Sequence, residues 1–232
     1  MELAPGAAAL LHTHRADYVF SVLEASTLEV FDARGASLGA VPVGPAGACH
    51  GFALSADGRT LVPAADDPAF GPLPATHSAL NVGPTAFREV LFECGPRTKD
   101  DAAMKNAAID DAEGADGPGG ARLLHRGGRV AVWEARLPPG GSLAEHAWGR
   151  ARALWVFAAT AGTLEVRAAG QAAGPVFRLE AGECSGLYPA TDGRFLEPAA
   201  AGQGLATPVA GRSAWRNAGP EALRLLLFEL VA

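Results

Sequence analysis

Apolar residues gather along this chain in short runs that are rich in β-branched and aromatic side chains, a composition typical of β-strands. The clearest runs cover residues 18–23, 87–92, 129–137 and 223–231. Turn-forming pairs separate the runs, among them Asp57-Gly58, Asp192-Gly193, Gly83-Pro84 and Gly219-Pro220. Short strands at this spacing predict an all-β chain built as a sandwich or barrel.

The strand pattern occurs twice, because the second half of the chain repeats the first at an offset of about 135 residues. Residues 81–93 (NVGPTAFREVLFE) match residues 217–229 (NAGPEALRLLLFE) at 8 of 13 positions. Residues 46–63 match residues 181–198 at 9 of 18 positions, and the sequence TLEV occurs at both 27–30 and 163–166. Matching blocks in the same order predict two copies of one β-rich unit.

The repeat divides the chain into residues 1–94, a segment 95–124 and residues 125–232. The middle segment is rich in charged residues and alanine and ends in Gly-Pro-Gly-Gly, which is typical of a flexible interdomain linker. The copies differ at their start, since the strand predicted over 129–137 has only Met1–Ala4 as its counterpart. The first domain therefore borrows that strand, lacks it, or belongs to a longer chain.

Composition and charge favour a small-molecule ligand over other partners. Of 232 residues, 49% are hydrophobic and 19% charged, with a net charge of -6, which is typical of a globular protein. No basic cluster suits nucleic acid, and no apolar stretch is long enough to span a membrane. Three cysteines without a CxxC pair suggest reduced thiols in the cytoplasm. Exposed edge strands need covering, so a homodimer is possible, and the sequence leaves the oligomeric state open.

Three of the six histidines form an informative set. His12 and His14 are two residues apart at the head of an apolar strand, so both side chains point to the same face. A third imidazole from a neighbouring strand would complete a site for a divalent transition metal, whether Fe, Mn, Ni, Cu or Zn. His50 and His125 have no such arrangement and are interpreted as surface residues.

The residues from His12 to Phe20 (HTHRADYVF), together with Gly47 and the later His77-x-x-x-Asn81, resemble the two signature motifs of the cupin superfamily. The resemblance covers most of residues 4–94 and, more weakly, 130–232. It implies two tandem jelly-roll-like cupin barrels, a bicupin, similar to uncharacterised small bacterial cupins. Carried over residue by residue, it assigns His12, His14 and His77 as metal ligands.

The chain departs from the family pattern at one position, where Tyr18 stands in place of the family's glutamate. Tyr18 has the same strand parity as the two histidines and should face the barrel interior, whereas Asp17 should face outwards. Tyr18 is thus a candidate for proton transfer, for weak ligation or for simple lining. A three-histidine metal site and a set of vestigial barrel histidines both remain open.

The second barrel keeps one histidine of the set. His146 aligns with His12, while Trp148 and Ser213 replace the other two, so this barrel is expected to be metal-free. One interpretation is a scaffold or dimerisation half. The other is a ligand pocket formed by His146, Trp148 and Arg150, with the arginine reaching an acidic ligand.

Two functions follow as expectations, because the fold alone does not determine one. The first is a metal-dependent enzyme, resembling a dioxygenase or an isomerase, that acts on a small polar metabolite in the first barrel. The second is a non-catalytic ligand-binding or regulatory bicupin whose histidines serve structure. The histidine set favours the enzyme, and the missing glutamate and the degenerate second barrel favour the alternative.

Overall fold

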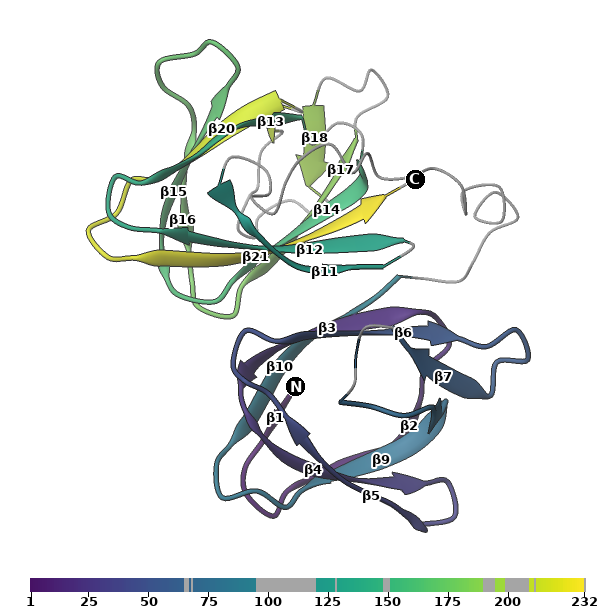
Figure 1. Ribbon diagram of the computed structural model, residues 1–232. Coiled ribbons are helices and arrows are strands. Elements are labelled where there is room, and N and C mark those ends of the chain that lie inside the picture. Colours follow the sequence, from purple (N-terminus) through teal and green to yellow (C-terminus); the bar gives the residue numbers. More distant parts are fainter. Residues whose placement is uncertain are drawn as a thin grey trace. The chain divides into compact units, whose positions relative to one another are not determined.

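The computed structural model describes residues 1–64, 67, 69–94, 120–127, 129–147, 151–189, 195–198, 209–210 and 212–231. These residues form strands and turns, and the chain divides into two compact units, Met1–Lys99 and Asp100–Ala232 (Figure 1). The all-β prediction is confirmed. Most of the predicted linker, residues 95–119, lies outside the described residues, and strand β11 begins at Arg122 within the rest of it. No helix among the described residues is long and apolar enough to cross a membrane.

The first unit consists of two antiparallel sheets. One has the strand order β1-β10-β3-β6-β7-β8 and the other β2-β9-β4-β5. The bounds of the strands are β1 Glu2–Leu3, β2 Ala8–Thr13, β3 Tyr18–Glu24, β4 Ser26–Asp32, β5 Ser37–Val43, β6 Cys49–Leu54, β7 Thr60–Pro63, β8 Leu73–Pro74, β9 Thr76–Asn81 and β10 Phe87–Glu93.

The second unit repeats this arrangement with the strand orders β11-β12-β21-β14-β17-β18-β19 and β13-β20-β15-β16. Each strand of the first unit has a counterpart in the same position, and among the described strands β11 has none. The bounds are β11 Arg122–Arg126, β12 Val130–Leu137, β13 Ser142–Ala147, β14 Ala151–Ala158, β15 Gly162–Ala168, β16 Val176–Leu179, β17 Cys184–Pro189, β18 Phe195–Pro198, β19 Val209–Ala210, β20 Arg212–Asn217 and β21 Leu223–Val231.

The predicted asymmetry at the start of the copies is visible in the ladders. β12 pairs with β21 over eight residues, from Val130 to Leu137. Its counterpart β1 pairs with β10 through Glu2 and Leu3 only. The first sheet of the first unit therefore begins with a much shorter strand than its counterpart.

Matching asparagines close each barrel in the same way. Asn81 is fully buried, and its Nδ2 donates to the carbonyl oxygens of Leu3 and Thr85 at 2.9 and 2.8 Å. Its Oδ1 accepts from the Gly83 N–H. Glycine is required at position 83, because a Cβ on this residue would clash with the Ser26 hydroxyl. Asn217 donates to Leu137 and Glu221 and accepts from Gly219 in the same pattern. The shared asparagines thus have a structural role, as the sequence predicted.

Alternate residues of the strands form each barrel's core. In the first unit Tyr18, Phe20 and Val22 of β3 pack with Phe52 of β6 and Phe87 of β10. The second unit has a core of the same type that includes Leu154, Val156 and Trp215. The period of two in these side chains is that of a sheet with one face turned to the core.

Candidate metal centre

The three predicted histidines lie together inside the first barrel, on the neighbouring strands β2 and β9. His12 and His77 are direct partners in the β2–β9 ladder, and His14 follows immediately after the end of β2. The ring centroids are 4.9 Å apart for His12 and His14, 4.8 Å for His12 and His77, and 5.2 Å for His14 and His77. The pairing of these two strands therefore brings together histidines that are more than 60 residues apart in the sequence.

Each of the three imidazoles has its Nδ1 atom bonded to an oxygen. Nδ1 of His12 lies 2.8 Å from the carbonyl oxygen of Leu10, and Nδ1 of His77 lies 2.8 Å from that of Pro74. Nδ1 of His14 lies 3.0 Å from Oε1 of Glu93. Carbonyl and carboxylate oxygens only accept, so each Nδ1 carries the proton and each neutral ring has its lone pair on Nε2.

The ligand atoms of the three imidazoles lie close together. The ligand atoms of His12, His14 and His77 all lie within 4.8 Å of one another, and Nε2 of His12 is 3.1 Å from Nε2 of His14. Two lone pairs at that distance repel unless a cation lies between them. Metal–nitrogen bonds of about 2.0–2.1 Å at tetrahedral or octahedral angles place two imidazole nitrogens about 3.0–3.4 Å apart. The His12–His14 pair has this separation, and three imidazoles are a donor set that suits a divalent transition metal.

Burial favours the neutral form of His14 and His77, which is the form that binds a metal. It lowers the pKa of His77 to about 4, with the neighbouring His12 and His14 acting in the same direction. Burial is also the largest effect on the pKa of His14 and lowers it. The hydrogen bond that His14 donates to Glu93 raises the pKa, but by less. Near neutral pH no proton competes strongly for these two Nε2 atoms.

Tyr18 and Glu93 flank the triad from the other sheet. The Tyr18 ring stacks on His14 at 4.2 Å between centroids, so this side chain faces the interior as its parity predicted. Burial raises the pKa of its phenol well above the ordinary value, and the charges of Glu89 and Glu93 add to the effect. Asp17 points elsewhere, and its Oδ1 accepts from the Leu54 N–H at 2.8 Å.

Glu93, which the sequence did not single out, places a carboxylate beside the triad, where it bonds the outer nitrogen of His14 and is not one of the three ligand residues. Glu93 is the direct ladder partner of Tyr18 in the β10–β3 pair. Its carboxylate bonds the outer nitrogen of His14, an arrangement that fixes the tautomer and orientation of ligating histidines in metal sites. Only the register between β3 and β10 could have revealed it, and the sequence does not specify that register.

A surface hollow of about 290 Å³ lies beside the triad strand, with Asp32 and Thr76 in its lining. Asp32 is the ladder partner of His77 in the β4–β9 pair, and Thr76 precedes His77 in β9. Arg34 and Arg59 also line it. The hollow thus presents two cationic side chains beside the strand that carries His77.

The second barrel fills the corresponding place with a tryptophan. His146 pairs with Ser213 in the β13–β20 ladder, as His12 pairs with His77, so the predicted alignment holds at this position. The Ser213 hydroxyl accepts from Nε1 of Trp215 at 2.9 Å, and Trp215 is completely buried. The side chain of His146 and all of Trp148 and Arg150 lie outside the described residues, so the predicted second pocket stays a prediction.

The interiors of the two barrels also differ in solvent access. Tyr18, Phe20 and Phe52 keep 4–6% of their surface accessible, whereas their counterparts Leu154, Val156 and Leu187 keep 0–2%. The same holds for Ala79 at 7% against Trp215 at 0%. All of these side chains are buried, and those of the second barrel are buried more completely.

Comparisons with known proteins agree with this architecture. No protein-family model matches the chain, and no curated protein matches it. Solved structures do: YhaK from Escherichia coli aligns with 100% of this chain and 83% of its own, at 15% identity and a TM-score of 0.51. Oxalate decarboxylase OxdC from Bacillus subtilis, itself a bicupin, aligns over 99% and 67%, at 14% identity and a TM-score of 0.50. The chain has the fold of a bicupin.

The bicupin fold is shared with a structure that contains a metal. The pirin YhhW from Escherichia coli, in complex with nickel(II), aligns with 99% of this chain and 79% of its own, at 12% identity and a TM-score of 0.51. At this level of identity the likeness concerns the fold. In this chain the three histidines themselves could hold a divalent ion.

Proposed function

We propose that the first barrel binds one divalent transition metal through His12, His14 and His77 and acts as a metal-dependent enzyme on a small polar metabolite. The observation that carries the proposal is the set of three Nδ1 hydrogen bonds, which leaves Nε2 of each ring as the available ligand atom in a cluster whose ligand atoms lie within 4.8 Å of one another. Histidines with a purely structural role would have no need to keep the Nε2 atom of all three rings as an acceptor.

The reaction class follows from what such a site can do. A bound divalent metal polarises a substrate oxygen or, if it is iron, activates dioxygen, which suits an isomerase or a dioxygenase. In this chain the three imidazoles hold the ion and Glu93 orients His14. Tyr18 is a neutral phenol at ordinary pH, and its raised pKa holds the proton on the oxygen, so it can donate a hydrogen bond to a substrate next to His14.

Two further observations support this function. The hollow beside β9 places Arg34 and Arg59 where a polar or anionic metabolite could approach. Among proteins of the same fold, YhhW is described with nickel(II) and OxdC as an oxalate decarboxylase.

The alternative is a non-catalytic, ligand-binding or regulatory bicupin. It is favoured by the ligand set, which contains no carboxylate, and by the solid interior of the second barrel around Trp215. The two functions differ in their requirement for a metal.

Elemental analysis of protein purified without a metal-affinity tag separates them. The proposal predicts about one equivalent of a transition metal per chain, reduced to trace amounts in His12→Ala and His14→Ala. His146→Ala, the counterpart of His12 in the second barrel, is the matched control and should retain the full equivalent. Trace metal in the wild type, with His14→Ala as stable as the wild type, would contradict the enzyme and leave the ligand-binding function.

A further inference from the structure

The surface hollow beside β9 lies at the same end of the first barrel as the three histidines. It is lined by the β4–β5 turn, the β6–β7 turn and the segment Pro74–Thr76, which leads into β9. Asp32, at the end of β4, pairs with His77 of the triad. Near the end of β6, Phe52 pairs with Tyr18, which stacks on a ring of the triad. The two turns therefore extend from the barrel end that carries the candidate metal centre.

The segment Pro74–Thr76 is bonded to the histidines and also lines the hollow. The carbonyl oxygen of Pro74 accepts from Nδ1 of His77 at 2.8 Å. The carbonyl oxygen of Ala75 accepts from the backbone N–H of His14 at 2.9 Å. The Ala75 N–H in turn donates to the carbonyl oxygen of Arg59 at 2.8 Å, which ties the β6–β7 turn to this segment. A ligand in the hollow would therefore be a neighbour of the metal centre.

Each of the two turns is held by its own aspartate, so the arginine that it carries starts from an ordered backbone. In the β4–β5 turn, Oδ1 of Asp32 accepts from the N–H groups of Arg34 and Ala36 at 2.8 and 2.9 Å. In the β6–β7 turn, Oδ1 of Asp57 accepts from the Arg59 N–H at 3.1 Å. Turns that are ordered in advance lower the entropic cost of binding.

The two arginines of the hollow differ from other arginines of the chain in having no acidic partner. Among the residues that the structure describes, the guanidinium groups of Arg34 and Arg59 form no ion pair and no hydrogen bond. Arg88 of the same unit is paired with Glu24 at 2.9 Å. The carboxylate of Asp32, which also lines the hollow, is engaged by its own turn. The hollow thus presents two cationic donors whose hydrogen bonds are available to a ligand.

The charge and size of the hollow define the class of ligand. Two positive charges, on Arg34 and Arg59, and one negative charge, on Asp32, leave its described lining with a net charge of +1. A singly charged carboxylate balances this charge, whereas a phosphate dianion would be repelled more strongly by Asp32. The planar guanidinium group also matches a carboxylate in geometry. A volume of about 290 Å³ suits a small molecule.

The second barrel lacks the charged groups that the β4–β5 turn contributes. The position of Asp32 is taken by Ala168, the ladder partner of Ser213. Two residues further along the chain, Gly170 replaces Arg34. The repeat keeps the barrel without these side chains, so the fold itself does not require them.

We propose that the hollow binds the carboxylate group of a small organic acid through Arg34 and Arg59. This site goes beyond the proposed function, because its donors are separate from the three histidines and need no metal. The two guanidinium groups bond the carboxylate oxygens from two different turns, and the β6–β7 turn is bonded to the segment that contacts the triad.

Titration of the ¹⁵N-labelled full chain with acetate, followed by NMR at constant ionic strength, tests this site. Acetate should shift the side-chain N–H resonances of Arg34 and Arg59 saturably, and acetamide, which has the same shape without the charge, should not. Inorganic phosphate should bind more weakly than acetate. Arg34→Gln and Arg59→Gln should each weaken acetate binding about tenfold. Arg178→Gln, which removes an exposed arginine of the second unit, is the control and should bind as the wild type does.

The charge of the lining is tested by Asp32→Asn. This variant keeps an oxygen acceptor for the turn and removes the negative charge, so it should bind acetate more tightly than the wild type. No saturable shift with acetate, equal shifts with acetamide, or phosphate binding at least as tight as that of acetate would overturn the carboxylate site. These outcomes are read on wild-type protein and do not depend on any variant folding.

His14→Ala separates this site from the proposed metal centre. It removes one of the three histidine side chains and should bind acetate as the wild type does, whereas loss of acetate binding would place the acetate at the triad and overturn the site. Metal content measured on the wild-type sample is independent. Acetate binding without metal sinks the proposed function alone, and metal without acetate binding sinks this inference alone.

Discussion

The carboxylate of Glu93 bonds the imidazole of His14, with 3.0 Å between Oε1 and Nδ1, although 79 residues separate them in the chain. Glu93 is 43% exposed at its side chain, while His14 is buried. The contact joins the two sheets of the first barrel at the candidate metal centre. In metal sites, a carboxylate bonded to the outer nitrogen of a ligating histidine fixes the orientation of the ring and raises its basicity.

Replacing Glu93 should weaken metal binding without abolishing it. Loss of such an outer carboxylate typically costs about 10–100-fold in metal affinity, so Glu93→Ala should fall in that range. Glu93→Gln keeps an oxygen acceptor for Nδ1 and should lose less. Calorimetric titration of metal-free protein with Zn²⁺ measures both. Glu24→Gln, which removes an exposed carboxylate paired with Arg88, is the control and should bind as the wild type does. Unchanged affinity in Glu93→Ala would remove Glu93 from the site.

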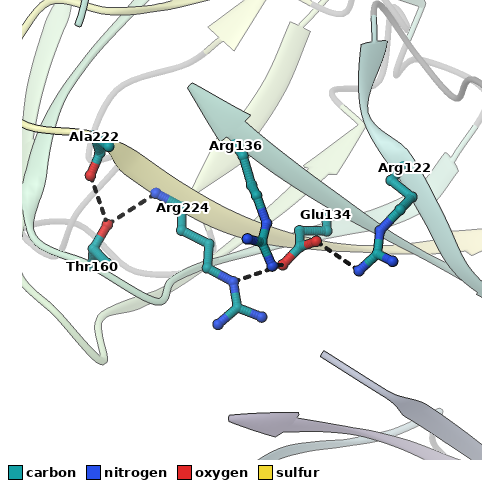
Figure 2. Close-up of polar contacts among 6 residues, drawn as sticks. All are labelled: Arg122, Glu134, Arg136, Thr160, Ala222 and Arg224. Carbon is teal, nitrogen blue, oxygen red and sulfur yellow. Dashed lines mark hydrogen bonds and ion pairs between the residues drawn. The ribbon is translucent and has the colours of Figure 1, made fainter. Parts of the chain in front are cut away.

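The carboxylate of Glu134 should make the second unit sensitive to acid. Arg136, Arg224 and Arg122 bond this buried side chain at 3.0, 2.7 and 2.9 Å (Figure 2). Burial alone would raise the pKa of Glu134, but the three arginines outweigh it and lower the pKa to about 2 from 4.5. Because the folded-state pKa is depressed, the stabilisation is present above pH 4.5 and is lost as the pH falls towards 2. Because Arg122 and Arg136 are largely exposed, solvent screening reduces this stabilisation to about 1–2 kcal/mol.

Urea unfolding of wild type and Glu134→Gln across this pH range checks the contribution of Glu134. The difference in unfolding free energy should be largest above pH 5 and should shrink steadily below it. Glu180→Gln, which breaks an exposed ion pair with Arg178, should show little difference at any pH. A Glu134→Gln difference that does not change with pH would show that the arginines do not hold this carboxylate ionised.

Trp215 should be a major source of stability in the second barrel. It is completely buried, and its indole N–H donates to the Ser213 hydroxyl. Truncation of a buried tryptophan leaves a cavity, so Trp215→Ala should cost about 3–5 kcal/mol of unfolding free energy, measured by urea denaturation. Ser213→Ala leaves only the N–H without an acceptor and should cost about 1–3 kcal/mol. A cost below about 1 kcal/mol for Trp215→Ala would contradict the solid interior of this barrel.

The sequence predicted the repeat, the all-β class and the residues that meet at the triad. Those predictions succeeded because they depend on local features: strand composition, turn residues and the two-residue spacing of His12 and His14. The structural role of Asn81 and Asn217 was also predictable, because a Gly-Pro turn follows each.

The other features of the first barrel depend on contacts that no local pattern specifies. Glu93 reaches His14 only through the register of β10 against β3. His50 was misassigned to the surface because its partner, Asp67, lies 17 residues away in a segment without strand character. In each case tertiary packing decides the environment.

The most direct test of the central claim is anomalous diffraction from crystals of Zn²⁺-loaded protein, recorded at the zinc edge. The account predicts one strong peak in the first barrel, about 2.0–2.1 Å from Nε2 of His12, His14 and His77, with the Nδ1 hydrogen bonds to Leu10, Glu93 and Pro74 preserved. Absence of a peak at this position, or a zinc ion bound through Nδ1 of any of the three histidines, would contradict it.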